Sequence, residues 1–123
     1  MKYLLLIYNQ EGDFQPPASQ EEMEAGLKPW WDYGAWLTEK GWWLGGNALQ
    51  PTATATTVRE RDGKVITTDG PFAETKEALG GYYMIDCDNL DQAIEAASKI
   101  PLANVGAIEV RPIMEFPEGP SSS

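Results

Sequence analysis

Tyr3–Tyr8 reads YLLLIY, six apolar or aromatic residues in a row, and this stretch decides the fold. A run of this length predicts a β-strand, and successive side chains of a strand point to opposite faces. Both faces of this strand are therefore apolar and need cover. Tyr82–Cys87 (YYMIDC) shows the same property much further along the chain. The fold has to bury two strands on both of their faces.

A first helix is predicted after residue 18. Ser19 and Glu22 form a capping-box pattern at its start, and Gly41 is a stop signal at its end. Gly26 and Pro29 interrupt the apolar stripe, so we expect the regular helix to begin only near Pro29. The stripe consists of Met23, Leu27, Trp30, Gly34 and Leu37.

A second helix is predicted directly after the YYMIDC strand. Asp88 or Asn89 caps it, Gln92 supports the cap, and Pro101 ends the helix. Its expected buried stripe consists of Leu90, Ala93, Ile94 and Ala97.

Three further regions predict strands. Trp42–Leu49 is a short strand with a glycine pair that indicates a bulge or bend. Thr54–Glu60 and Lys64–Thr68 flank Asp62-Gly63, which is a hairpin turn signal. Ala107–Phe116 supplies the last strand. The order β-α-β-(hairpin)-β-α-β predicts an α+β fold of the ferredoxin-like type with an inserted hairpin.

This topology has a consequence for assembly. Two helices can cover only one face of a four-stranded sheet, yet the two central stretches are apolar on both faces. The second face would expose a large apolar patch, which soluble monomers avoid. We therefore expect a homodimer in which two sheets pack face to face.

Size and charge limit the possible partners. The chain has 123 residues, which fits one domain, and its formal net charge is −10. Such a field repels phosphate backbones and anionic lipid surfaces, so we expect no nucleic acid and no membrane as partner. The single cysteine, Cys87, allows no intramolecular disulfide, and the N-terminal stretch lacks the features of a signal peptide. These features predict a cytoplasmic protein.

The absence of histidine is the most useful exclusion. It excludes Ser-His-Asp and Cys-His catalysis and every metal site that needs an imidazole. The sequence also contains no calcium loop of the EF-hand type. We expect no metal and no cofactor.

Asp69–Glu77 (DGPFAETKE) admits an interpretation as a plain loop. Asp, Gly and Pro together reverse the chain. Ala73–Leu79 then forms a single helical turn, whose charged residues Glu74, Lys76 and Glu77 lie in solvent.

The same stretch can also be interpreted as a site. Without histidine, a carboxylate in a cleft is the best available general base, and Asp69 is the candidate. Lys76 lies within plausible reach and could polarise a carbonyl or hold an anion. Phe72 in the middle of the loop is either buried or offered to a ligand.

Two other groups of side chains could take part. Glu109 and Arg111 share one face of the last strand, as an anion contact in a dimer-facing cleft or as an ion pair at its rim. Tyr8 and Tyr82 could form a hydrogen-bonding wall. Five tryptophans surround the first helix and could wall an apolar pocket or belong to the core: Trp30, Trp31, Trp36, Trp42 and Trp43.

DGPFAETKE and the following LGGYYMID resemble the DGPF proteins of the bacterial YCII-related family. MKYLLLIY at the start, GGNALQPTATATTVR before the hairpin and GAIEVRPIMEF at the end agree with it. The resemblance implies one YCII-related domain over residues 1–118, a dimeric α/β barrel, and a flexible tail at 119–123. It also implies an association with sigma factors, while the family's biochemical role is largely unassigned.

The resemblance has one gap. YCII-like relatives have been proposed to use a histidine–aspartate pair. Asp69 matches the aspartate, but the histidine has no counterpart, and Trp30–Tyr33 stands where we would expect it. The dyad is therefore in doubt for this chain.

Three functions follow from these features. The first is a small-molecule-binding or regulatory protein whose cleft is formed by the DGPF loop in a homodimer. The second is a metal-free enzyme of isomerase or lyase type that uses Asp69 as acid/base. The third is a structural dimer in which the loop serves packing.

Overall fold

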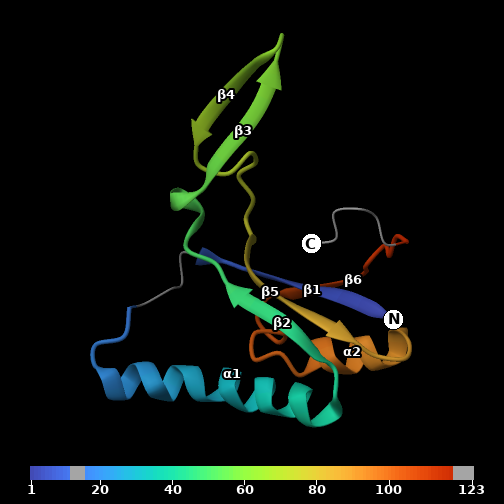
Figure 1. Cartoon of the computed structure of the whole chain (residues 1–123). Helices are drawn as coiled ribbons and strands as arrows, with labels where there is room; N and C mark the ends of the chain where they lie inside the picture. The colour runs from blue at the N-terminus through green and yellow to red at the C-terminus, as the bar shows by residue number, and fades with distance from the viewer. Residues whose placement is uncertain (12–15, 118–123) are drawn as a thin grey trace.

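A computed structural model describes residues 1–11 and 16–117 of the chain (Figure 1). The tail predicted at residues 119–123 lies outside the described residues. The elements are β1 (Lys2–Asn9), α1 (Gln20–Lys40), β2 (Trp43–Ala48), the short 3₁₀ helix η2 (Thr52–Thr54), β3 (Thr56–Arg61), β4 (Lys64–Asp69), β5 (Ala78–Asp86), α2 (Leu90–Ser98) and β6 (Ala107–Pro112).

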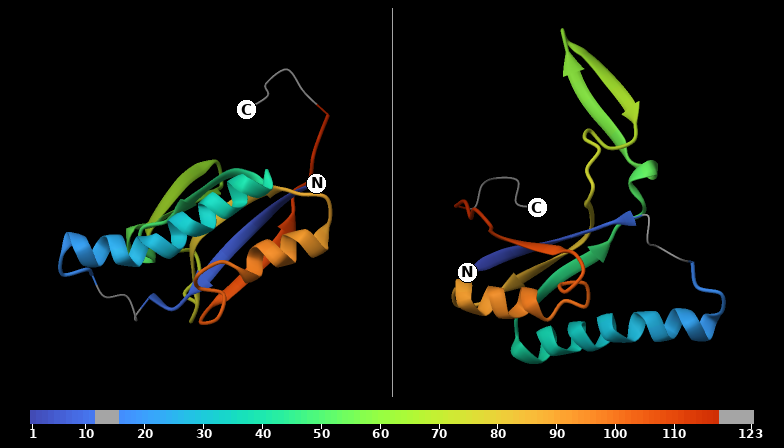
Figure 2. Two further views of the ribbon diagram at one scale, coloured as in Figure 1. Left: turned by 90° about the horizontal axis from the view of Figure 1, so that it is seen from below. Right: turned by 180° about the vertical axis from the view of Figure 1, so that it is seen from behind.

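The main sheet has four strands in the order β2-β5-β1-β6, and each neighbouring pair runs antiparallel. Both helices lie on the same side of this sheet (Figures 1 and 2). The β3–β4 hairpin is a separate two-stranded ribbon inserted between β2 and β5. The predicted α+β, ferredoxin-like architecture with an inserted hairpin is confirmed. The homodimer stays a prediction, since the structure describes a single chain.

The central strand β1 has the two apolar faces that its sequence predicts. Tyr3, Leu5 and Ile7 are buried beneath the helices, while Leu4 and Leu6 on the other face are only half-buried. The buried set packs against Leu37 of α1, Ile85 of β5 and a group of alanines in α2. The hydrophobic core therefore lies on one side of the sheet.

Helix α1 begins earlier than its sequence suggests. The Ser19 side chain accepts a hydrogen bond from the Glu22 N–H at 3.1 Å, and the helix runs from Gln20 straight through Pro29. The expected start near Pro29 is wrong. The helix surface at Pro29 is exposed, so water can satisfy the backbone carbonyl that loses its N–H partner there. The predicted stop at Gly41 is confirmed, with a left-handed φ of 76°.

Helix α2 begins at the predicted cap but presents a different face. The Asn89 side chain accepts a hydrogen bond from the Gln92 N–H. Ala93 and Ala97 are buried as expected, but Leu90 and Ile94 are each 50% exposed. Ala96 is buried in their place, and its carbonyl accepts a hydrogen bond from the buried Tyr33 hydroxyl at 2.8 Å. The small alanine side chains let α2 approach the sheet closely. The larger side chains of Leu90 and Ile94 therefore lie on the outward face of the helix.

The hairpin and the strands beside it follow the sequence closely. Asp62 and Gly63 both have positive φ, at 54° and 74°, which is the conformation of a type I′ turn. The hairpin projects away from the rest of the chain (Figure 1). A register irregularity between Trp43 and Gly45 confirms the bulge expected in β2.

Two expectations near strand ends are wrong. Residues 71–77 form bends without a helical turn, and β5 already begins at Ala78, opposite Asn9 of β1. Pairing with β1 here outweighs the helix propensity of AETKEAL. The last strand ends at Pro112 instead of Phe116, because the antiparallel ladder there reaches the start of β1, where Pro112 pairs with Tyr3.

Candidate functional site

A large cavity lies between α1 and the β2–β5 edge of the sheet. Its volume is about 930 Å³. Three tryptophans and Tyr83 give it an aromatic wall, Tyr82 also lines it, and we call it the aromatic cleft. The lining residues are Ile7, Asn9, Glu11, Leu27, Trp30, Trp31, Gly34, Trp43, Gly46, Asn47, Ala48, Leu49, Gln50, Pro51, Gly80, Gly81, Tyr82, Tyr83 and Leu102.

The aromatic wall is assembled from three elements. Trp30 and Trp31 come from α1, Trp43 from β2 and Tyr83 from β5. The Tyr83 ring lies near-parallel to Trp30, with 6.4 Å between centroids, and edge-on to Trp43 at 5.9 Å. Gly46 keeps this wall open, because a Cβ there would come within 2.7 Å of the Tyr83 ring.

The other two tryptophans have a different role. Trp36 and Trp42 pack edge-to-face at 5.6 Å near the end of α1, and neither lines the aromatic cleft. The Lys40 ammonium lies over both rings, and the Lys99 ammonium lies over Trp36. Trp36 and Trp42 pack against the hydrophobic core, Trp31 and Trp43 line the cleft, and Trp30 does both.

Among the described residues that line the cleft, Glu11 is the one with a formal charge. It follows β1, and its two carboxylate oxygens accept hydrogen bonds from the N–H and hydroxyl of Thr52, at 2.7 and 2.6 Å. These hydrogen bonds hold the pKa of the Glu11 carboxyl below its usual value. Sequence reasoning missed Glu11, because it stands in a turn-rich loop next to no motif.

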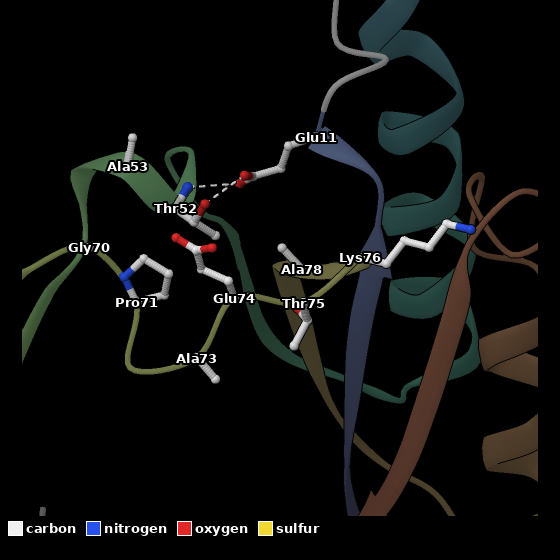
Figure 3. A pocket seen from close by; sticks show the side chains of 10 residues that line it. All are labelled: Glu11, Thr52, Ala53, Gly70, Pro71, Ala73, Glu74, Thr75, Lys76 and Ala78. Atoms are coloured by element: carbon white, nitrogen blue, oxygen red, sulfur yellow. Dashed lines mark hydrogen bonds between the residues drawn. The ribbon is translucent and has the colours of Figure 1, made fainter.

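A second cavity, of about 480 Å³, lies beside the DGPF loop (Figure 3). Figure 3 shows the Glu74 carboxylate turned toward Thr52 and Glu11, while the Lys76 side chain extends away from them. Glu11 lines this cavity as well as the aromatic cleft. The lining residues are Glu11, Thr52, Ala53, Gly70, Pro71, Ala73, Glu74, Thr75, Lys76 and Ala78.

The start of the DGPF loop is fixed by its backbone. Gly70 has a φ of 95°, its N–H donates to the Ala55 carbonyl at 2.7 Å, and its own carbonyl accepts from the Thr57 hydroxyl at 2.8 Å. Gly70 and Pro71 contribute to the wall of the second cavity. The start of the DGPF loop is therefore hydrogen-bonded to the residues at the start of the hairpin.

Asp69 and Phe72 stand apart from both cavities. Asp69 is the last residue of β4, opposite Thr56, and its side chain is exposed. The Phe72 side chain is 80% exposed. Neither residue lines either cavity, and within 1–11 and 16–117 no ion pair joins Asp69 to Lys76. Of the residues of the DGPF stretch that were predicted for a site, only Lys76 lines one of the two cavities.

Tyr8, Tyr82 and Arg111 lie on the sheet face that the helices leave open, which we call the open face. The strand register places Leu6 between Tyr82 and Glu109, and Leu4 beside Arg111. Of these residues, Tyr82 also lines the aromatic cleft. Its hydroxyl accepts a hydrogen bond from the Asn47 side chain at 2.9 Å.

Glu109 joins two of these residues into a network. The Arg111 guanidinium donates to Glu109 at 2.6 Å, and this hydrogen bond lowers the pKa of the Glu109 carboxyl. The Tyr8 hydroxyl donates to the other carboxylate oxygen at 3.3 Å. Burial and the Glu109 charge raise the pKa of Tyr8. The predicted shared face of Glu109 and Arg111 is confirmed.

Neither metal chemistry nor a reactive thiol is indicated by the described residues. Among them no group of three Cys, Asp or Glu side chains converges as metal ligands would. Cys87 is buried, and burial raises the pKa of its thiol. In the same part of the chain, neither helix has the length and apolarity to cross a membrane.

Comparison with known proteins gives the family. The model of the YCII-related domain matches residues 1–117. The chain belongs to the YCII-related family. It is also 41% identical, over 122 residues, to an uncharacterized protein of Rhizobium meliloti (strain 1021), and the match covers 97% of each chain. The family resemblance of the DGPF stretch is thus confirmed, and the function rests on the geometry of the site.

Proposed function

We propose that this member of the YCII-related family is a small-molecule-binding protein that works as a homodimer. The observation that carries the proposal is the aromatic cleft, with its volume of about 930 Å³. Ligand sites in proteins are typically concave and mostly apolar, with volumes of about 300–1,000 Å³ and a few polar groups that orient the ligand. The cleft combines these properties.

The lining supports a ligand with a large apolar part. Aromatic rings offer broad contact surfaces and lose little conformational freedom when a ligand binds. Asn9 and Gln50 also line the cleft and can donate or accept hydrogen bonds. The Trp31 side chain is 57% exposed, and a bound molecule would cover an indole that water now contacts.

The DGPF loop enters the proposal as a wall. The second cavity shares Glu11 with the aromatic cleft, and its wall includes Gly70 and Pro71. The ligand region thus extends from the sheet and the first helix toward the loop. Proton transfer by Asp69 finds no support in this geometry, because Asp69 lines neither cavity. The proposal is therefore one of binding.

The open face supports the homodimer. Leu4, Leu6 and Met84 are only half-buried there, on neighbouring strands β1 and β5. Sheets that expose such side chains are commonly covered by a second sheet. An isologous dimer would cover the same patch on both copies at once.

A ligand screen tests the binding function. Melting temperature is measured with the full chain against a metabolite library, because a ligand that binds only the native state raises it. Hits are then titrated by intrinsic tryptophan fluorescence. We expect Trp31→Leu to lower the binding affinity of the hits. Phe72 is an exposed aromatic residue outside the cleft, and Phe72→Leu should leave that affinity unchanged. Hits that bind both variants like the parent would place the site elsewhere, and a screen without hits would refute the proposal.

A further inference from the structure

The charge of the aromatic cleft has one sign. Among the described residues that line it, Glu11 alone carries a formal charge, and no lysine or arginine is present. Both carboxylate oxygens of Glu11 are held by Thr52. Hydrogen bonds of this kind stabilise the ionised form, and the lowered pKa of Glu11 agrees with that. At neutral pH the cleft therefore contains a fixed negative charge.

The aromatic wall favours the same kind of ligand. The face of an indole or phenol ring is electron-rich and attracts a cation placed within about 6 Å of its centroid. Trp30, Trp31, Trp43 and Tyr83 bring four such rings to one cavity. An ammonium group with alkyl substituents suits this wall, since its surface is apolar while its charge is attracted to the ring faces.

Trp36 and Trp42, which lie outside the cleft, differ from the tryptophans inside it in their contacts with lysine. The Lys40 ammonium lies 5.8 Å from the ring centroid of Trp36 and 5.5 Å from that of Trp42, and the Lys99 ammonium lies 5.4 Å from that of Trp36. Within residues 1–11 and 16–117, no lysine or arginine lies over Trp30, Trp31 or Trp43 in this way. The tryptophans outside the cleft thus have cations from the chain itself, and those inside it are free to receive one.

We propose that the aromatic cleft binds an organic cation: a quaternary or protonated amine attached to an apolar or aromatic body. The inference rests on the proposed small-molecule-binding function and names the ligand class. The rings surround the cationic head, Glu11 balances its charge, and the apolar side chains around Leu27 and Leu49 receive the body. The net charge of −10 raises the local concentration of such a ligand.

An isosteric pair of probes tests the charge directly. Benzyltrimethylammonium and neopentylbenzene have nearly the same shape, but only the first is charged. Binding of each to the full chain is followed by tryptophan fluorescence and by calorimetry. We expect the cation to bind about tenfold more tightly than its neutral isostere. We also expect added salt to weaken binding of the cationic probe and to leave binding of the neutral probe unchanged, because salt screens only charged groups.

Matched variants locate the effect. Glu11→Gln removes the charge and keeps hydrogen-bonding groups for Thr52, so it should reduce the preference for the cation several-fold. Glu39→Gln makes the same change of charge on α1 outside the cleft and should leave the preference unchanged. Trp31→Leu should lower the binding affinity of both probes, whereas Phe72→Leu should lower the affinity of neither. Circular dichroism verifies that each variant is folded.

The outcomes distinguish the preference for cations, the ligand class and the binding function from one another. Equal affinity for the two probes would overturn the preference for cations and leave a general small-molecule cleft in place. Failure of both probes to bind would overturn the ligand class. If the metabolite screen also gave no hit, the proposed small-molecule-binding function would be refuted as well. A cation preference that Glu39→Gln reduces as much as Glu11→Gln would indicate the general field of the protein and contradict a site in the cleft.

Discussion

The Glu11 carboxylate is held by Thr52 through two hydrogen bonds, one from the backbone N–H at 2.7 Å and one from the hydroxyl at 2.6 Å. This contact links the end of β1 to the η2 segment across 41 positions of the sequence. It also fixes the ionised carboxylate of Glu11, which lines both the aromatic cleft and the second cavity beside the DGPF loop. The charge of the candidate site thus depends on a pair of residues that no sequence motif connects.

Thr52→Val should raise the pKa of Glu11 toward the usual value of a glutamate. The substitution removes the hydroxyl donor, which is the largest cause of the lowered pKa, and keeps the backbone N–H. The pKa of Glu11 is lower in the folded chain than in the unfolded one. The stability from this contact is therefore present above the unfolded pKa and is lost as the pH falls through the folded pKa. NMR titration of the side-chain carboxyl measures the change.

Thr54→Val serves as the control for that experiment. The Thr54 hydroxyl donates to the Pro51 carbonyl, in the same segment but away from Glu11. A Glu11 pKa that moves equally in both variants would show that the segment as a whole, rather than the Thr52 hydroxyl, sets it.

Gly70→Ala should lower stability, while Asp69→Asn should have little effect. Gly70 has a φ of 95°, and a side chain in such a conformation costs about 1–2 kcal/mol. Asp69 is exposed, and the described hydrogen bonds and ion pairs do not include its side chain. Urea denaturation of the two variants gives both free energies of unfolding. A large loss of stability in Asp69→Asn would instead favour a structural role for its carboxylate.

Tyr33→Phe should destabilise the core by about 0.5–1.5 kcal/mol. The Tyr33 hydroxyl donates to the Ala96 carbonyl at 2.8 Å, and the side chain is buried between α1 and α2. Removal of the hydroxyl takes away the shorter of two hydrogen bonds to the Ala96 carbonyl, which then accepts only from the Lys99 N–H at 3.3 Å. Thermal or urea unfolding measures the effect. Tyr82→Phe, on the open face, is the matched control, and a loss of equal size there would argue against this explanation.

Met84→Glu should dissociate the proposed homodimer. Met84 lies on the open face opposite Leu4, where a second sheet would have to accept the new charge. We expect the dissociation constant to rise by at least about tenfold, measured by sedimentation equilibrium. Val65→Glu, at an exposed apolar position of the hairpin, should not change it. A parent chain that sediments as a monomer at micromolar concentration would refute the dimer.

Much of the fold could be predicted because its signals are local. YLLLIY and YYMIDC indicate strands whatever surrounds them, Ser19 and Asn89 reach N–H groups three residues away, and Asp62-Gly63 closes its own turn. Each depends on neighbours in the sequence, so each was visible there.

The errors arose where distant contacts outweigh local preference. AETKEAL favours a helical turn, but pairing of Ala78 with Asn9 extends β5 through its end. Leu90 and Ile94 look like core residues, yet the close approach of α2 to the sheet selects alanines instead. In the first case, hydrogen bonds to β1 outweigh a weak intrinsic preference.

The sequence by itself determined the order of the elements, the two-faced central strands, and the family to which the DGPF stretch points. Only the tertiary structure decided which residues share a cavity. The aromatic cleft takes Glu11 from the end of β1, Trp30 from α1, Trp43 from β2 and Tyr83 from β5. It also placed Asp69 outside that group. The physical reason is that a cavity is enclosed by side chains from separate elements, whose meeting depends on strand order and helix packing rather than on spacing along the chain.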